Sequence, residues 1–93
     1  MGVVQPAGSG LGGGGFAVVV LPGGEASVLD FREVAPASST ETMYQDASDE
    51  TASRIGGLAV GVPGESAGLL ELNKRWGRLP LKEVVQPAVD LAN

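Results

Sequence analysis

Residues 16–32 read FAVVVLPGGEASVLDFR, and this stretch decides the fold class of the 93-residue chain. The run from Phe16 to Leu21 is short, apolar and rich in valine, which is typical of a buried strand. The PGGE sequence that follows has the composition of a tight turn. Ala26–Arg32 alternates well enough to be the returning strand, so the stretch predicts an antiparallel β-hairpin.

Less regular sequence follows the hairpin. Residues 33–54 have no sustained period and are rich in Ser, Thr, Asp and Glu, so we expect an irregular surface excursion. Leu58–Val62 (LAVGV) predicts another short strand, which Pro63 and Gly64 end before a helix opens.

The last third of the chain predicts helices. Over Glu65–Trp76, apolar residues recur on one face, with an acid in the first turn and bases in the last. Gly77 is placed as the residue that follows this helix and is able to adopt the left-handed conformation. A further helical segment begins near Pro80. Pro87 is expected to divide it into two short helices, because proline lacks an N–H and clashes with the preceding turn.

The order of turn, hairpin, irregular segment, strand and helices indicates the α+β class. We find no internal repeat and no linker that would divide the chain. Ninety-three residues allow one small domain at most, or part of a larger one, since a chain of this size buries only about 60–65% of its unfolded surface. Nine of the 15 glycines fall in the first 24 residues, so the glycine enrichment needs a local explanation.

Charge and composition exclude several classes of function. The net charge is −5 and the densest basic group (Lys74, Arg75 and Arg78) reads as a solvated helix end, so nucleic-acid binding is not expected. The chain has no cysteine and no histidine, which rules out a disulfide, a thiolate nucleophile, a Ser–His triad or a His-ligated metal built from this chain alone. No run of about 20 apolar residues predicts a membrane span, and the first residues lack the pattern of a secretory signal. The cellular compartment stays undetermined.

Two motifs invite a functional interpretation that their context does not favour. Gly8–Gly13 (GSGLGG) matches G-x-G-x-x-G, but a strand follows it where a dinucleotide fold requires a helix. A turn or close backbone packing is the favoured interpretation. Asp46, Asp49 and Glu50 lack the spacing of a calcium loop and are expected to be solvated acids. The threonine hydroxyls lie beside no evident base and are interpreted as caps or turn residues.

Charged residues cluster at the end of the second predicted strand. Side-chain alternation puts Asp30 and Arg32 on one face and Glu33 on the other. An exposed ion pair is the simpler interpretation. The functional one is an arginine whose planar fork can bind a carboxylate through two hydrogen bonds.

Three ordered blocks resemble one known family. VVQPAGSGLGGGGF (residues 3–16) resembles the glycine-rich turn and strand near the start of gamma-glutamyltransferases, also called gamma-glutamyltranspeptidases or glutathione hydrolases. LDFREVAP (residues 29–36) resembles their D-x-R-E-x-A-P block. Residues 56–92 resemble their G-x-P-G…G…YG-x-LP…PA-x-LA block. The likeness spans nearly the whole chain.

This resemblance implies an N-terminal nucleophile hydrolase with a four-layer αββα sandwich. Residues 1–93 would then be an incomplete domain near the start of the large subunit. The family's precursor cleaves itself into two subunits, and a threonine at the small subunit's new N-terminus attacks the gamma-glutamyl amide of glutathione and related compounds. The α-amine of that threonine can act as its base, so neither histidine nor a cofactor is implied. The implied partners are the rest of the large subunit, the small subunit and a small gamma-glutamyl substrate.

The resemblance assigns a role to one residue here. Arg32 matches the arginine that holds the α-carboxylate of the glutamyl donor, while Asp30 and Glu33 would position it. Trp76 stands where the family commonly has Tyr, and Leu81 where Trp is frequent. The catalytic threonine has no counterpart in the chain, so the resemblance implies a fragment that is inactive alone.

Two alternatives stay open beside this interpretation. The chain could be a non-catalytic remnant or binding module, or it could belong to a related amide acylase. Because a fragment of a sandwich would leave strand edges and an apolar face uncovered, we also expect the isolated chain to aggregate or to be partly unfolded.

Overall fold

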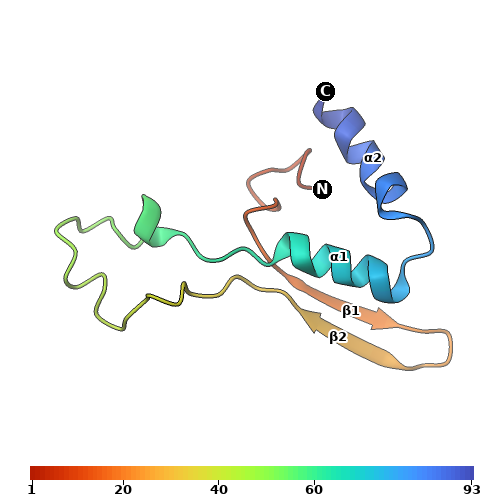
Figure 1. Cartoon of the computed structure of the whole chain (residues 1–93), viewed down its shortest axis with the longest axis horizontal. Coiled ribbons are helices and arrows are strands. Elements are labelled where there is room, and N and C mark those ends of the chain that lie inside the picture. The colour runs from red at the N-terminus through yellow and green to blue at the C-terminus, as the bar shows by residue number, and fades with distance from the viewer.

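The computed structural model describes all 93 residues as a β-hairpin followed by helices (Figure 1). Strand β1 spans Phe16–Val20 and strand β2 spans Ala26–Asp30. A short 3-10 helix, η1, covers Gly57–Ala59, and two α-helices follow, α1 at Glu65–Trp76 and α2 at Leu81–Ala92. The α+β class with an antiparallel hairpin is therefore confirmed, as is the irregular excursion before η1.

The hairpin pairs Phe16 with Asp30 and Val20 with Ala26. Its turn closes through an N–H of Gly24 that donates to the carbonyl of Leu21 at 2.8 Å. Gly24 has a φ of +84°, which glycine adopts without the steric cost that a Cβ would add. The predicted returning strand was two residues longer than β2, although Gly15 and Phe31 still exchange two backbone hydrogen bonds, of 2.9 and 3.3 Å, just beyond it.

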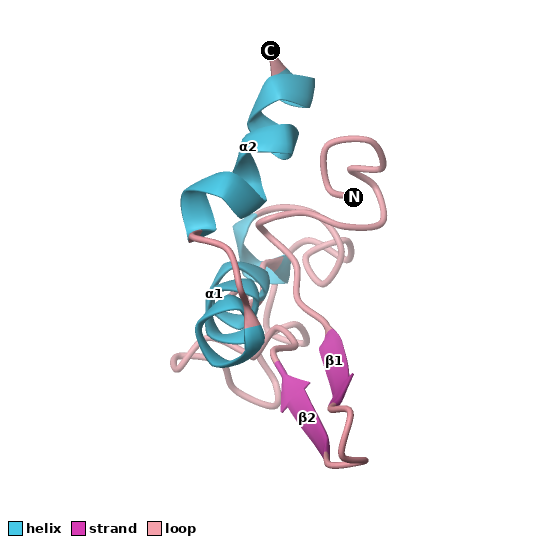
Figure 2. Cartoon of the chain, turned by 90° about the vertical axis from the view of Figure 1, so that its right-hand side faces the viewer, coloured by secondary structure: helices cyan, strands magenta, loops and turns pink.

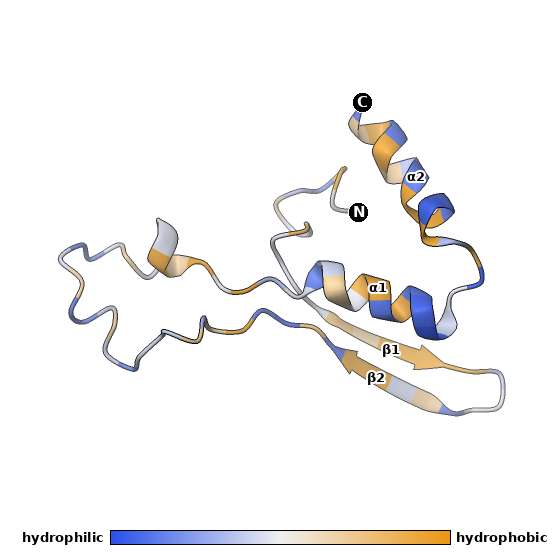
Figure 3. Cartoon of the chain, in the orientation of Figure 1, coloured by the Kyte–Doolittle hydropathy of each residue, from blue (hydrophilic) through white to orange (hydrophobic).

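The two faces of the hairpin have different surroundings. Half-buried side chains such as Val19 and Leu29 alternate with exposed ones along both strands. Helix α1 packs against β2 (Figure 2). On the opposite face, Phe16, Val18 and Val28 are 64–70% exposed. Figure 3 shows that both strands are largely apolar, so this face presents hydrophobic surface to solvent.

Helix α1 begins and continues as its sequence predicts. It starts after Pro63 and Gly64 and carries an acid in its first turn and bases in its last. In its last two turns, Nε of Arg75 donates to the Glu71 carboxylate at 2.6 Å. This hydrogen bond lowers the pKa of Glu71, because it stabilises the charged carboxylate.

Gly77 follows the helix as predicted, but it does not adopt the left-handed conformation available to it. Its φ and ψ are −68° and 148°, so the chain leaves α1 in an extended conformation on its way to α2. The N–H of Gly77 still donates to the carbonyl of Asn73 at 2.8 Å. A Cβ at this position would overlap Asn73, so the glycine supplies room rather than a positive φ.

The predicted strand at Leu58–Val62 was wrong. Its first residues belong to η1, and pairing is limited to a single bridge between Val34 and Val62. That bridge is made by two N–H···O bonds of 3.2 and 2.8 Å. Apolar, β-branched composition favours a strand, but a strand needs a partner of matching length, and only one residue of the excursion lies alongside.

Helix α2 runs unbroken through Pro87, contrary to the predicted division into two helices. The proline lacks the N–H that would bond to the carbonyl of Glu83, so one helical bond is lost. The side chains of Gln86 and Asp90 form a hydrogen bond of 2.7 Å that spans the proline. The hydrogen bonds on either side are enough to continue the helix.

The chain has almost no interior of its own. Only Ala52 and Gly68 are buried. The accessible surface is 7296 Å², against about 5000 Å² expected for a compact protein of this mass. The radius of gyration is 17.0 Å, against about 12 Å for a compact chain of this length. No helix has the length and apolar character needed to cross a bilayer.

Candidate substrate-binding site

Arg32 lies just beyond the end of β2 and is held through three contacts. Its backbone N–H donates to a carboxylate oxygen of Asp30 at 3.0 Å. Its Nε lies 3.5 Å from Oε2 of Glu33, and its guanidinium carbon lies 6.0 Å from the centroid of the Phe16 ring. The Arg32 side chain is still 59% exposed. Its two terminal nitrogens form no hydrogen bond within the chain, so one side of the planar fork is open.

The predicted arrangement of the three charged residues was partly wrong. Alternation placed Glu33 opposite Arg32, but the two side chains form an ion pair. Asp30 contacts the backbone of Arg32 rather than its guanidinium. Strand alternation does not extend to Arg32 and Glu33, because backbone hydrogen bonding between the two arms of the hairpin ends at Phe31, which pairs with Gly15.

Glycines fix the backbone on which Arg32 is mounted. A Cβ on Gly64 would overlap the carbonyl of Phe31, and one on Gly68 would overlap the Phe31 ring. A Cβ on Gly14 would lie 2.5 Å from that carbonyl and 2.9 Å from Cα of Arg32. The start of α1 and the glycine loop (residues 8–15) therefore approach the chain at Phe31 closely from two sides. This contact holds the backbone of Arg32 in place.

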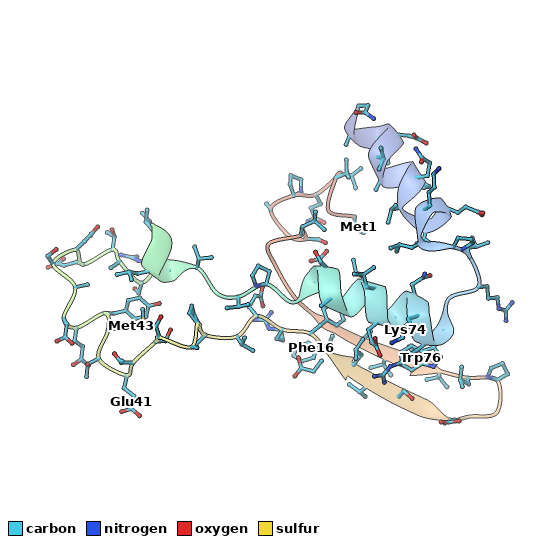
Figure 4. All side chains as sticks on the ribbon, in the orientation of Figure 1. Met1, Phe16, Glu41, Met43, Lys74 and Trp76 are labelled. Atoms are coloured by element: carbon cyan, nitrogen blue, oxygen red, sulfur yellow. The ribbon has the colours of Figure 1, made fainter.

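A hollow of about 340 Å³ opens beside Arg32. It lies between the glycine loop, Arg32 with Glu33, and the first residue of α1, Glu65. Figure 4 labels Phe16, the first residue of β1. Just before this residue, the glycine loop passes beside the start of α1. The hollow is thus lined mainly by backbone, one guanidinium and two carboxylates.

The two carboxylates of the hollow have different partners. Glu65 accepts hydrogen bonds from the Oγ of Ser9 at 3.2 Å and from the N–H of Gly10 at 3.3 Å. Oε2 of Glu33 is shielded from solvent and accepts no hydrogen bond. Its 3.5 Å contact with Nε of Arg32 is an ion pair and not a hydrogen bond, because typical N–H···O distances are about 2.7–3.2 Å. Arg32 therefore offsets the Glu33 charge without saturating either group.

The other residues singled out in the sequence lie elsewhere. Asp46 and Asp49 are exposed and bond to threonines, and the N–H of Thr51 lowers the pKa of Asp49. Lys74, Arg75 and Arg78 are exposed near the end of α1, as predicted. No group of three acidic side chains could hold a metal ion. The GSGLGG segment forms turns and leads into β1, which confirms the turn interpretation.

Sequence reasoning missed two residues that line this hollow. Glu65 was interpreted only as an acid that complements the helix dipole, and Ser9 as a turn residue. Their contact joins positions 56 residues apart. Sequence reasoning also assigned Phe16 only to the strand, although its ring lies near the Arg32 guanidinium. The periodicity of apolar residues within one element does not predict contacts between residues far apart in the sequence.

The sequence profile of the Gamma-glutamyltranspeptidase family matches residues 1–93. The chain belongs to this family. One relative is glutathione hydrolase 2 of Arabidopsis thaliana, which is 48% identical to this chain over 92 residues. That match covers 99% of this chain and 16% of the plant protein. The chain thus spans about a sixth of the length of the curated relatives it matches.

Solved structures of the family superimpose on the same residues. The gamma-glutamyltranspeptidase of Helicobacter pylori is 43% identical with a TM-score of 0.91, covering 99% of this chain and 27% of that one. The enzyme from Pseudomonas nitroreducens, solved in complex with L-DON, is 38% identical with a TM-score of 0.89. That match covers 98% of this chain and 28% of the neighbour. The extended shape described above is therefore the shape of this segment within family members.

Proposed function

We propose that this chain forms the donor-binding part of a gamma-glutamyltransferase or glutathione hydrolase, in which Arg32 binds the α-carboxylate of the gamma-glutamyl group. The proposal rests on which nitrogens of the Arg32 guanidinium have partners within the chain. One nitrogen of its guanidinium faces Glu33, while the terminal nitrogens are unbonded beside an open hollow. A carboxylate can accept two parallel hydrogen bonds from such a fork, which fixes its orientation as well as its position.

The chemistry would be completed by residues outside this chain. In the mechanism implied by the family, a threonine hydroxyl adds to the γ-carbonyl carbon while the threonine α-amine takes the proton. The leaving amine departs with that proton, and an ester links the glutamyl group to the enzyme. Water or an acceptor amine then breaks the ester. Arg32 would contribute by holding the glutamyl group in register with the threonine.

The hairpin's exposed face supports the αββα sandwich. One face of the hairpin packs against α1, and the other leaves Phe16, Val18 and Val28 in solvent. A sheet that is apolar on both faces is stable only between two layers. We infer that the rest of the large subunit and the small subunit supply the second sheet. The tests of activity need the complete protein, which is this chain together with the remaining length that its relatives have.

The test is Arg32→Lys in the complete protein, with steady-state kinetics on a chromogenic gamma-glutamyl anilide. Lysine keeps the charge but loses the fork. A hydrogen bond to a charged group contributes about 1.5–3 kcal/mol, so loss of one of the two at about 2 kcal/mol should raise the donor KM roughly 30-fold. Arg78→Lys is the matched control, because Arg78 is exposed and forms no ion pair. An unchanged donor KM in Arg32→Lys would refute the assignment.

The same variants separate the alternatives. If the protein were an acylase for other amides, Arg32→Lys would slow amides with and without an α-carboxylate equally. If the chain were a non-catalytic remnant, the parent protein would cleave no gamma-glutamyl anilide, and Arg32→Lys would have no activity to change. Selective loss with α-carboxylate donors is the result that supports donor binding by Arg32.

A further inference from the structure

Glu65 joins two segments that are distant in the sequence. Its side chain leaves the first turn of α1 and reaches the glycine loop, where its carboxylate accepts from Ser9 and Gly10. Its own backbone N–H donates to the carbonyl of Gly13 at 2.9 Å. The residue therefore holds the loop near both ends of the segment between Ser9 and Gly13.

The segment held in this way forms a wall of the hollow beside Arg32. Ser9, Gly10 and Gly13 all line it. Gly13 lies between the two carboxylates, since a Cβ built there would be 3.5 Å from Glu65 and 3.6 Å from Glu33. Any movement of the loop away from Glu65 would change the shape of the space that faces the guanidinium.

A glycine-rich loop has more freedom to lose than other segments. Glycine gives up more conformational entropy on ordering than any other residue. If the loop were mobile before the donor arrives, binding would have to order it. The free energy of that ordering would then be lost from the binding free energy of the donor. Hydrogen bonds that order the loop in advance remove this cost.

We infer that Glu65 is a positioning residue that holds the glycine loop in its binding-competent shape. This inference rests on the proposed role of Arg32, because the loop matters for donor binding only if the donor's carboxylate enters that hollow. The role belongs to the reach and hydrogen bonding of the Glu65 side chain, not to its charge.

The competing explanation is that Glu65 serves only the helix. An acid in the first turn stabilises a helix through its dipole. Two substitutions separate the explanations. Glu65→Asp keeps the charge at the helix start but shortens the side chain by one methylene. Glu65→Gln removes the charge but keeps the length, and its amide can accept from Gly10 while it donates to the Ser9 oxygen.

The experiment compares these variants in the complete protein by donor kinetics. We expect Glu65→Asp to raise the donor KM about 10-fold with kcat within about twofold, and Glu65→Gln to stay near the parent. The helix explanation predicts the reverse order, and that order would overturn the inference. Glu71→Asp is the matched control, since Glu71 lies on the same helix and pairs only with Arg75.

Hydrogen exchange gives a readout that does not depend on activity. Glu65→Asp should speed exchange in peptides that cover residues 8–15 and leave those covering 16–30 unchanged. If neither exchange nor KM moves, the inference is wrong. If exchange speeds up while KM stays constant and Arg32→Lys still raises KM, the contact is structural only and the inference is again wrong. If Arg32→Lys leaves KM unchanged, the proposed function fails, whereas exchange still reports whether Glu65 holds the loop.

Discussion

Gly68 sets how closely α1 approaches the end of β2. It is one of two buried residues in the chain, and the Phe31 ring occupies the space where its side chain would be. Phe31 directly precedes Arg32, so a shift of the Phe31 backbone would also move the arginine. The position of Arg32 thus depends on a residue that never faces the hollow.

We expect Gly68→Ala to destabilise the complete protein by up to about 2 kcal/mol. Replacing a helical glycine by alanine normally stabilises by roughly 1 kcal/mol, but overpacking against Phe31 costs about 1–3 kcal/mol. Denaturant unfolding measures the difference. Gly57→Ala serves as the control, because a Cβ there meets nothing within 4 Å. A stabilised Gly68→Ala variant would show that Phe31 has room to move.

At the scale of elements, α2 carries a proline where a helix tolerates it poorly. Pro87 is the seventh residue of the helix and leaves the carbonyl of Glu83 without its usual donor. Pro80, in contrast, precedes the first turn, where an N–H has no helical acceptor to lose. Pro87 is therefore expected to destabilise the helix more than Pro80 does.

We predict that Pro87→Ala raises the free energy of unfolding of the complete protein by about 1–3 kcal/mol. The restored N–H can bond to Glu83, and the ring no longer crowds the preceding turn. Denaturant midpoints and far-ultraviolet circular dichroism measure the gain. Pro80→Ala should change stability by much less. Equal effects from both substitutions would mean that the helical position of Pro87 does not carry the cost.

At the scale of the whole molecule, the chain exposes what a domain would bury. Its shape is flat and extended, with axes of 52, 37 and 18 Å. Valines on the outer face of the hairpin, such as Val18 and Val28, are among its most exposed apolar residues. With this surface uncovered, hydrophobic burial cannot offset the entropy of folding.

We therefore expect the isolated 93-residue chain to aggregate or to be partly unfolded. Size-exclusion chromatography and thermal unfolding test this directly. Val18→Thr combined with Val28→Thr should increase the monomeric fraction, because both side chains lie on the uncovered face. Leu29→Thr, on the face toward α1, should not. A cooperative transition from a clean monomer of the parent chain would contradict the expectation.

The sequence alone determined the elements whose signals are local. The valine run and the PGGE turn specify the hairpin, and apolar spacing with charged ends specifies α1. These features depend on residues a few positions apart, so their composition is sufficient evidence. The ordered blocks also pointed to the family and to Arg32.

Tertiary structure decided what depends on a distant partner. Leu58–Val62 has the composition of a strand, but it finds only Val34 to pair with. Gly77 looked like a helix terminator with a positive φ. In the structure its lack of a side chain instead leaves room for Asn73. Glu65 and Ser9 meet across 56 residues. Local propensity cannot encode such contacts, because each is set by where the chain returns in space.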